Sequence, residues 1–585
     1  MRTVAEHLAE RARTHPAQVA LHVPGRAITF AELHADSDAL ASGLQSVGIV
    51  AGTRVALMVP PGLDFFSLTF ALFKIGAVPV LIDPGMGMKN LGVCLAQAEP
   101  EAFIGSAKAH LARRLFGWAK RSLRTTVNVG GWRFLCTAST AELRRDLTPR
   151  PPLRSGEGEQ GKLAAILFTS GSTGIAKGVE YTHAIFSAQI ELLKATYGIE
   201  PGEIDFCTFP LFALFGAALG MTCVVPIMDA TRPANIDPAT VRAQLRQFRC
   251  TNLFASPAVL KRLANEHGAD PADYASVRRV ISAGAPATPA VLEAFSKLLP
   301  AGVPIFTPYG ATECLPVANI SSAEILNETR ALTEQGRGVC VGRPVAGMEV
   351  MVIPITDGAI DFLPLSASER GFGGEVWRHA RSDNQLSLNL PGQTSPPNPL
   401  SEAERGDKMR IGEFVVRGPV VTPRYFRNPT ASALAKIHDP ATGETLHRMG
   451  DVGYIDERGR LWFCGRKSQR VVTVHGTLFT DMVEPVFNYR EPASRTALVG
   501  VARGGLLYPV LCYEPGCKHL TIADQLQLLK ERAMSFEHTR HIATFLQYDL
   551  FGFPVDVRHN SKIFREKLAV WADKRLGPKW NGGPA

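Results

Sequence analysis

The chain of 585 residues is 45% apolar, and 63 Lys and Arg residues against 54 Asp and Glu give a net charge of +9. This composition supports a large folded core and excludes global disorder. At about 150 residues per domain, the length predicts roughly four folding units. The positive excess is interpreted as spread over the whole chain, with no basic tract dense enough to indicate binding to DNA or RNA.

The N-terminus and the cysteines predict a cytoplasmic location. Residues 1–18 are charged and helically spaced, without the apolar region and cleavage site of a signal peptide. Ten cysteines form no CxxC or CxxC…HxxxH set, so we expect free thiols rather than disulfides or a zinc site. The uncharged residues 206–228 are long enough to cross a bilayer, but prolines and glycines interrupt them. We interpret this run as buried core and expect no integral membrane segment.

The first hundred residues alternate between helix and strand signals. Thr29 and Glu32 form a capping-box pattern before a helix whose leucines recur at helical spacing. Next come a buried strand, a helix and a second strand, followed by further strands. The alternation predicts an α/β fold built from parallel-rich sheets with crossover helices. The predicted strands are residues 54–61, 77–84, 163–168, 251–256, 277–282 and 303–307, and the first helix between strands is residues 62–75.

Two segments interrupt this pattern, and the last part of the chain differs from it. Residues 147–161 and 361–407 are rich in Pro, Gly and polar residues, so we interpret both as surface loops or insertions. Short strands and two amphipathic helices in the last 120 residues predict a small α+β domain. We therefore predict an N-terminal domain over residues 1–464 and a C-terminal domain over residues 465–585, with strands at 471–474, 496–501 and 509–513.

The strongest local signal is LFTSGSTGIAKGV at residues 167–179. Small residues let backbone N–H groups turn toward phosphate oxygens, and a lysine adds a positive charge. The segment follows an apolar strand, and we expect a helix after it. It is not a Walker A loop, which needs GxxxxGK[ST], and the chain has no GxSxG nucleophile elbow. The pattern predicts a phosphate-binding loop of Thr169, Ser170, Gly171, Ser172, Thr173, Gly174 and Lys177.

Two further glycine-bearing loops follow predicted strands. Ligands of open α/β sheets bind beyond the carboxyl ends of the strands, so these loops and the phosphate loop are expected to enclose one nucleotide. Tyr309 offers a face for stacking, Thr312 a hydroxyl, and Glu313 a hard oxygen ligand that indicates Mg²⁺ beside a triphosphate. The backbone of the two loops is supplied by Gly284, Ala285, Pro286, Gly310 and Ala311.

Five motifs in order resemble the adenylate-forming superfamily of acyl-CoA synthetases, peptide-synthetase adenylation domains and luciferases. They are LFTSGSTGIAKGV, YGATE, the Gly450-Asp451 of HRMGDVGYID, the Gly465-Arg466 of WFCGRKSQRV, and the Ser561-Lys562 of HNSKIFRE. The resemblance covers residues 5–575. It implies a large N-terminal domain, a small mobile C-terminal domain, and activation of a carboxylate by ATP to an acyl-adenylate and pyrophosphate.

The resemblance also implies roles for single residues. Thr169 to Lys177 would hold the β- and γ-phosphates, Gly284 to Pro286 with Tyr309 would frame adenine, and Thr312 would contact the α-phosphate. Glu313 would bind Mg²⁺, Asp451 the ribose hydroxyls, and Arg466 the nucleotide. Lys562 would bridge the substrate carboxylate and the α-phosphate. The chain departs from the usual pattern at Ala176, where proline is common, and at Ala213, where histidine is common. The hinge after Arg466 also differs, so no pivot residue is assigned.

Apolar residues predict the acyl substrate. Phe209, Phe212, Ala213 and Phe215 would leave space for a long apolar acid. The overall pattern most resembles the β-lactone synthetases of bacterial long-chain olefin biosynthesis, in which the 3-hydroxyl of a long-chain 2-alkyl-3-hydroxy acid attacks the activated carbonyl, giving a β-lactone and AMP. Assembly with other enzymes of that pathway is a further expectation. A fatty acyl-CoA synthetase or fatty acyl-AMP ligase shares the adenylation motifs, and a nucleotide-binding regulator without turnover is the remaining alternative.

Overall fold

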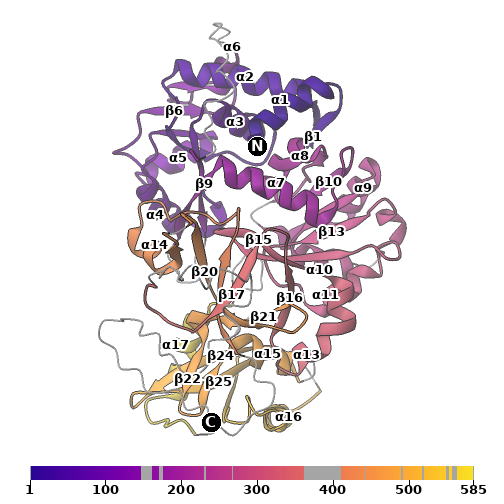
Figure 1. Ribbon diagram of the computed structural model, residues 1–585, viewed down its shortest axis with the longest axis vertical. Helices are drawn as coiled ribbons and strands as arrows, with labels where there is room; N and C mark the ends of the chain where they lie inside the picture. Colours follow the sequence, from indigo (N-terminus) through magenta and orange to yellow (C-terminus); the bar gives the residue numbers. More distant parts are fainter. Residues whose placement is uncertain are drawn as a thin grey trace.

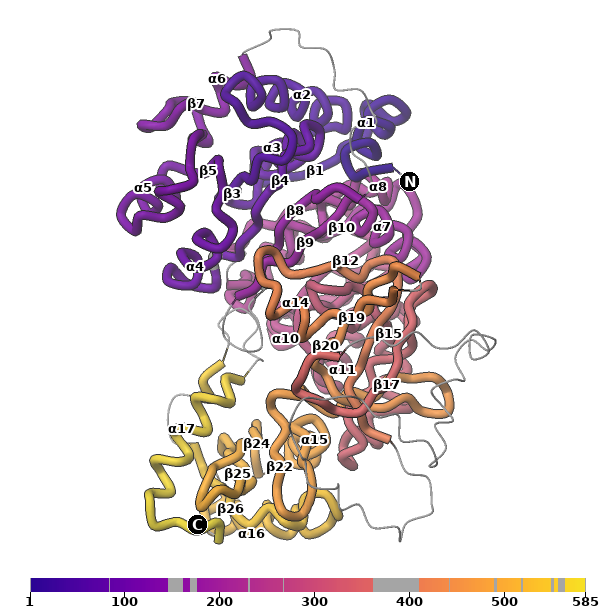
Figure 2. Tube along the Cα trace, turned by 60° about the vertical axis from the view of Figure 1, so that its left-hand side comes forward, coloured from indigo at the N-terminus to yellow at the C-terminus, as the bar shows by residue number. Residues whose placement is uncertain are grey.

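Figures 1 and 2 show an elongated molecule, with the N-terminal elements at one end and the C-terminal elements at the other. The computed structural model describes residues 2–145, 161–169, 176–229, 232–266, 268–360, 410–440, 442–488, 492–516, 519–548, 552–555 and 563–583. The predicted insertion at 361–407 lies outside these residues, as does nearly all of the predicted loop at 147–161.

A seven-stranded sheet forms the core of the N-terminal end. It is parallel from β7 to β8, and β9 pairs antiparallel at its edge. The predicted strands at 54–61, 77–84 and 163–168 are confirmed as β3, β4 and β8. In spatial order the strands are β7 Ala138–Ser139, β6 Thr125–Asn128, β5 Ala102–Gly105, β3 Arg54–Met58, β4 Val78–Leu81, β8 Leu163–Thr169 and β9 Lys177–Thr182.

The predicted capping box is present at the start of α2. The Thr29 hydroxyl accepts from the Glu32 amide at 3.2 Å, and the Thr29 amide donates to Glu32 Oε2 at 2.8 Å. Two otherwise unpaired N–H groups are thereby satisfied, which favours a helix beginning at this point. The helices of this end are α1 Val4–Thr14, α2 Phe30–Ser46, α3 Leu63–Lys74, α4 Met88–Ala98, α5 Ala107–Leu115 and α6 Thr140–Arg145.

The larger sheet has fourteen strands and is mixed. From β14 to β1 its neighbours run parallel, whereas from β17 to β14 they run antiparallel, so the parallel prediction holds for only part of it. The parallel part is β14 Ile305–Ala311, β13 Arg279–Ser282, β12 Asn252–Ala255, β10 Ile204–Cys207, β11 Thr222–Val224 and β1 Val19–Val23, followed by antiparallel β2 Arg26–Thr29. The antiparallel part is β17 Glu349–Ile353, β18 Gly412–Arg417, β20 Thr445–Ile455, β21 Leu461–Arg466, β16 Val339–Pro344 and β15 Cys314–Ser321, with β19 Lys436–His438 beside β20.

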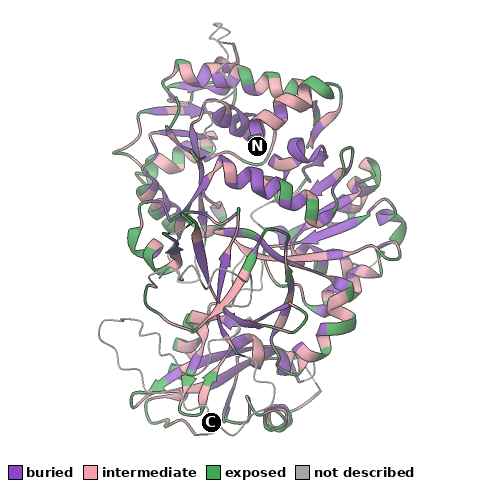
Figure 3. Cartoon of the chain, viewed as in Figure 1, coloured by how far each residue is buried: buried purple, intermediate pink, exposed green. Residues whose placement is uncertain are grey.

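Helix α7, His183–Tyr197, lies between the two large sheets. It contacts β9 of the smaller sheet and β15 of the larger one. Figure 3 shows buried strands inside these layers and exposed residues along the outer helices. The other helices of this part are α8 Gly216–Leu219, α9 Pro238–Phe248, α10 Pro257–Ala264, α11 Pro289–Ser296, α12 Ser322–Glu324, α13 Arg330–Glu334 and α14 Pro429–Ala435.

The last strand that the chain contributes to the large sheet, β21, ends at Arg466, and the strands after it form separate small sheets. Strands β22 and β23 make one hairpin, and β24, β25 and β26 make a three-stranded sheet. Among the described residues of this part, three α-helices rather than the predicted two accompany them. The bounds are β22 Val471–Thr473, β23 Gly476–Leu478, β24 Ala493–Arg503, β25 Leu506–Pro515, β26 Thr544–Gln547, α15 Thr480–Asn488, α16 Ile522–Met534 and α17 Arg565–Leu576.

The uncharged residues 206–228 fold into short elements. They include the end of β10, a 3₁₀ turn at Pro210–Phe215, α8 and β11. In the described part of the chain, no helix has the length and apolar character needed to span a membrane.

Candidate active site

The predicted phosphate loop connects two antiparallel strands. Thr169 at the end of β8 pairs with Lys177 at the start of β9, and residues 170–175 lie outside the described part. The helix expected directly after the loop is therefore wrong, because α7 begins only at His183. Residues Gly178 to Tyr181 are buried, so they extend the sheet rather than forming a helix start. A helix N-terminus directly after the loop is therefore not available for phosphate binding.

YGATE is the tip of a β-hairpin rather than a loop after a strand. Tyr309, Gly310 and Ala311 belong to β14, which pairs antiparallel with β15. Thr312 and Glu313 form the two-residue turn between these strands. The Tyr181 hydroxyl donates to the Thr312 carbonyl at 2.5 Å, which ties this turn to β9 of the other sheet. The hairpin therefore brings Glu313 close to the strand that carries Lys177.

The predicted adenine loop lies next to this hairpin. The loop follows β13, and β13 lies beside β14 of the hairpin, with Ile281 paired with Phe306. Gly284 has a φ of 94°, which a residue with a side chain rarely adopts. Gly284 and Pro286 are exposed and Ala285 is half-buried, so the backbone of this loop is open to a ligand.

Asp451 joins Tyr309 and Arg466. The Tyr309 hydroxyl donates to Asp451 Oδ2 at 2.5 Å, and Arg466 Nη1 lies 2.7 Å from Asp451 Oδ1. The Asp451 side chain is 2% exposed. Burial raises the pKa of the Asp451 carboxyl, while the Arg466 guanidinium opposes this change. Both oxygens of this carboxylate therefore have a protein partner in this arrangement.

Glu313 is the centre of a second polar cluster. The Tyr425 hydroxyl donates to Glu313 Oε1 at 2.8 Å, and Lys177 Nζ lies 5.1 Å from the centroid of the Tyr425 ring. The Thr422 hydroxyl donates to the Glu313 carbonyl at 2.9 Å and accepts from Lys436 Nζ at 3.0 Å. Burial lowers the pKa of Lys436 to about 8, against an opposing effect of the Glu313 carboxylate.

Sequence analysis missed Tyr425, Thr422 and Lys436. They lie more than a hundred residues beyond Glu313, outside all five motifs, and become neighbours because the strands after the insertion return to the same sheet. Tyr425 also forms an isolated bridge with Val179 of β9. No periodicity or motif in the sequence marks these residues as site residues.

The two clusters together suit a metal-bound nucleotide. The positive side chains of Lys177, Lys436 and Arg466 outnumber the carboxylates of Glu313 and Asp451, which favours binding of phosphate groups. No described residue hydrogen-bonds to Glu313 Oε2, and the side chain is half-buried rather than sealed. A carboxylate oxygen with that access is the kind of ligand that Mg²⁺ uses beside substrate phosphates.

The predicted acyl-site residues divide into buried and exposed groups. Phe212 and Ala213 are buried, Phe215 is half-buried, and Phe209 is 50% exposed. Phe212 stacks on Phe254, with ring centroids 4.3 Å apart. Sequence analysis missed Phe254. The predicted strand at 251–256 includes this residue, and alternation along the strand places its side chain on the same face as that of Asn252. The segment with Phe209, Phe212 and Phe215 follows the carboxyl end of the parallel strand β10, and Phe254 lies near the carboxyl end of β12. Ligands of such sheets bind at these ends.

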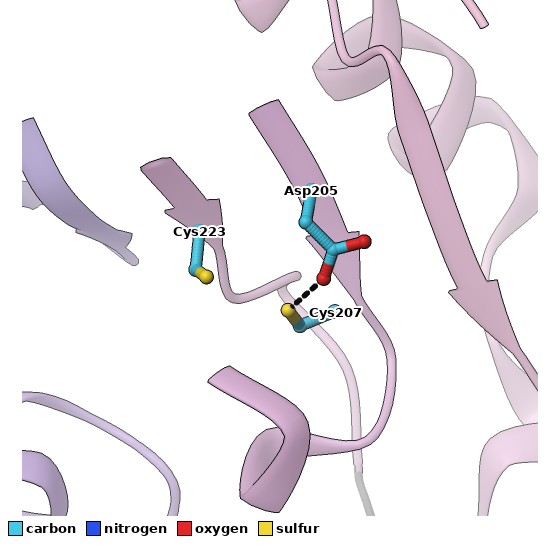
Figure 4. Close-up of side chains that lie close together, drawn as sticks. All are labelled: Asp205, Cys207 and Cys223. Carbon is cyan, nitrogen blue, oxygen red and sulfur yellow. Dashed lines mark hydrogen bonds between the residues drawn. The ribbon is translucent and has the colours of Figure 1, made fainter. Parts of the chain in front are cut away.

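A buried polar cluster lies under this aromatic segment. Figure 4 shows Asp205, Cys207 and Cys223 directed toward one another from β10 and β11, and their ligand atoms lie within 4.8 Å of one another. The Cys207 thiol and the Asn252 amide each donate to the Asp205 carboxyl group. Burial raises the pKa of Asp205 to about 7. We interpret the cluster as a hydrogen-bonded part of the core rather than a metal site, because both carboxyl oxygens already have protein partners.

The remaining predicted residues lie outside the described part. They are Lys562 and the glycine- and serine-rich centre of the phosphate loop, residues 170–174. The structure therefore brings Lys177, Tyr309, Thr312, Glu313, Asp451 and Arg466 into one region. The loop of Gly284, Ala285 and Pro286 follows β13, the strand beside β14.

Comparison with known proteins gives a consistent result. A family described as AMP-binding enzyme matches residues 8–377. The chain is 45% identical to an olefin beta-lactone synthetase of Stenotrophomonas maltophilia, with 98% of each protein covered. It is 25% identical to a long-chain-fatty-acid–CoA ligase of Salmonella typhimurium, with 85% of this chain and 82% of that protein covered. The fold is similar to that of an O-succinylbenzoate coenzyme A synthetase from Bacillus subtilis in complex with ATP and magnesium ion, with a TM-score of 0.70, 20% identity, and 96% of this chain and 98% of that chain covered.

Proposed function

Because the chain belongs to the AMP-binding enzyme family, we propose that it is an AMP-forming ligase that makes a β-lactone in olefin biosynthesis. The proposed substrate is a long-chain 2-alkyl-3-hydroxy acid. The observation that carries this proposal is the 45% identity to an olefin beta-lactone synthetase over 98% of both proteins. The lower identity to a long-chain-fatty-acid–CoA ligase makes acyl-CoA or free acyl-AMP formation a less supported alternative.

In the first half-reaction, a carboxylate oxygen of the acid attacks the α-phosphorus of ATP and releases pyrophosphate. Lys177, Lys436 and Arg466 supply the positive charge that reduces repulsion between the carboxylate and the phosphates. Glu313 would hold Mg²⁺ through its carboxylate, and the bound ion neutralises phosphate charge. We also propose that the phosphate loop, Thr312 and Lys562 contact the phosphates, as the sequence motifs imply.

In the second half-reaction, the 3-hydroxyl oxygen of the same molecule attacks the activated carbonyl carbon. The C–O bond to AMP breaks, AMP leaves with the bridging oxygen and its electron pair, the hydroxyl proton passes to solvent, and the four-membered lactone forms. Since nucleophile and carbonyl belong to one molecule, no coenzyme A is needed as acceptor. Phe209, Phe212, Ala213 and Phe215, together with Phe254, are proposed to line the space for the alkyl chains.

The domain division belongs to the same proposal. We propose an N-terminal domain over residues 1–464 and a C-terminal domain over residues 465–585 that moves relative to it. The last strand of the large sheet in chain order, β21, ends at Arg466, two residues beyond this boundary, which supports a division near this point. Lys467, just beyond it, contacts both carboxylate oxygens of Glu413 at 3.0 Å, so the linker is held by the large sheet in this arrangement. The nine free cysteines of the described residues support a reducing, cytoplasmic location.

The test is a product assay with purified protein, ATP, Mg²⁺ and a long-chain 2-alkyl-3-hydroxy acid, with and without coenzyme A. The proposal expects AMP and β-lactone in equal amounts in both reactions. An acyl-CoA product, with AMP formed only when coenzyme A is present, would establish the alternative ligase instead. The same acid without its 3-hydroxyl is the matched control and should give an acyl-adenylate, trapped as a hydroxamate, but no lactone.

A further inference from the structure

The positive charge of the chain is concentrated in one region rather than spread evenly. Residues 102–141 include seven Lys and Arg residues and no Asp or Glu, a local charge of +7 within a chain of +9. This corrects the interpretation of an even distribution. The stretch contains β5, α5, β6 and β7, and Figures 1 and 2 show α5 and β6 or β7 at the outer margin of the N-terminal end. The basic residues are Lys108, Arg113, Arg114, Lys120, Arg121, Arg124 and Arg133.

Large apolar side chains of the same stretch are exposed to solvent. Leu111 is 53% exposed, Leu115 73%, Phe116 58%, Trp132 70% and Leu135 77%. Groups of exposed apolar side chains of this size mark interaction sites on proteins. We call these five residues, with the basic residues listed above, the α5 patch.

Contacts within the region connect α5 with the loop between β6 and β7. Leu111 and Leu115 are one turn apart on α5, and Arg114 Nη2 donates to the Leu135 carbonyl at 2.8 Å. The Trp132 ring lies 6.1 Å from the Phe134 ring in an edge-on arrangement. The C-terminal end of α5 and the loop between β6 and β7 therefore form one surface.

The backbone of this loop is held in an unfavourable conformation. Phe134 has a φ of 43° and Leu135 a φ of 59°, values that bulky side chains rarely adopt. Such conformations persist where surrounding structure enforces them and are common at binding sites. Here the conformation accompanies a leucine with most of its surface in water.

We propose that the α5 patch docks the protein onto an anionic lipid bilayer, with the apolar side chains entering the headgroup region. Charge complementarity supports this partner, because six of the seven basic side chains are exposed and only Arg133 pairs with a carboxylate among the described residues, Glu142 at 2.9 Å. Exposed leucine and tryptophan beside Lys and Arg is the composition of surfaces that bind in the membrane interface. The docking is independent of the reaction proposed for the active site.

The test is co-sedimentation of the full chain with vesicles of phosphatidylcholine alone or of phosphatidylcholine with phosphatidylglycerol. The wild-type protein is expected to bind the anionic vesicles, and added salt should weaken binding. The triple variant Lys120→Glu, Arg121→Glu, Arg124→Glu should bind at least on the order of a hundredfold less. Loss of each basic residue costs roughly fivefold near an anionic surface, and each added carboxylate is repelled by it. The variant Leu115→Ser, Trp132→Ser, Leu135→Ser should bind on the order of tenfold less or weaker.

Matched controls separate docking from changes in folding or total charge. Lys261→Glu with Arg262→Glu changes two exposed charges on α10, and Met534→Ser removes an apolar side chain that is 67% exposed on α16. Both controls should bind like the wild type, and all variants should keep the wild-type melting temperature. Equal binding of the wild type to neutral and anionic vesicles, or unchanged binding of both patch variants, would overturn the proposal. The proposal would also be overturned if the wild type did not bind vesicles and the patch variants instead lost self-association or binding to an acidic protein.

Discussion

Replacing Asp205 by Asn should stabilise the protein above neutral pH and leave it nearly unchanged in acid. Asp205 is fully buried, and burial raises its pKa from 3.8 to about 7. Between these values the unfolded chain carries an ionised carboxylate while the folded protein keeps the proton. Folding therefore binds a proton, and the stability contributed by the neutral carboxyl, full below 3.8, is lost as the pH rises toward 7.

The magnitude follows from the two pKa values. The free energy of unfolding of the wild type falls by about 1.4 kcal/mol for each pH unit between these two values. The total loss above pH 7 therefore has an upper limit of about 4 kcal/mol. The Asp205→Asn variant would have no such dependence, because the introduced amide does not ionise. This amide keeps an oxygen that accepts from Asn252, although the contact with the Cys207 thiol changes. The stability difference between variant and wild type should therefore grow with pH and level off above about pH 7.

The assay is urea unfolding of both proteins at a series of pH values from about 5 to about 8. Asp270→Asn is the matched control, because Asp270 is exposed, caps a short helix, and can be replaced by another good capping residue. Its stability difference from the wild type should not vary in the same way. Parallel pH profiles for wild type and Asp205→Asn would refute the reasoning, because they would mean that Asp205 titrates alike in folded and unfolded chains.

Three further predictions concern the proposed site. Lys436→Met should lower the rate of adenylate formation by on the order of a hundredfold. The wild-type rate should fall as the pH passes about 8, where Lys436 loses its proton. If the variant kept the same pH profile, this prediction would be contradicted. Glu313→Gln should shift the Mg²⁺ dependence of pyrophosphate release to higher concentration by about tenfold or more, measured by metal titration, whereas an unchanged curve would remove Glu313 from metal binding. Phe212→Ala should destabilise the fold by about 3–5 kcal/mol, because its ring is buried against Phe254. Phe209→Ala removes a half-exposed ring and should change stability by about 0.5 kcal/mol or less. Equal losses of stability in urea unfolding would contradict this assignment.

Local patterns were sufficient to predict much of the fold. The strands at 54–61, 77–84 and 163–168 were predictable because central strands of a parallel sheet are buried on both faces and so are continuously apolar. The capping box at Thr29 was predictable because its hydrogen bonds join residues three positions apart. The helix expected after the phosphate loop was wrong, since Lys177–Thr182 is short enough to be either a strand or a helix start.

Contacts between distant segments were not predictable in the same way. Tyr425 contacts Glu313 directly and Lys436 is linked to it through Thr422, because β18 to β21 extend the large sheet beyond β16. The pairing of Tyr309 with Asp451 likewise joins residues that are 142 positions apart. The motifs predicted that these two residues share a site, but not that the tyrosine hydroxyl donates a hydrogen bond to the aspartate carboxylate.

The most direct test of the central proposal follows the oxygen atoms. A 2-alkyl-3-hydroxy acid labelled with ¹⁸O in both carboxylate oxygens is incubated with the protein, ATP and Mg²⁺ in the absence of coenzyme A, and both products are analysed by mass spectrometry. If the carboxylate attacks the α-phosphorus and the 3-hydroxyl then closes the ring, AMP gains one ¹⁸O and the β-lactone keeps one. Unlabelled AMP, or labelled AMP without any lactone, would contradict the account.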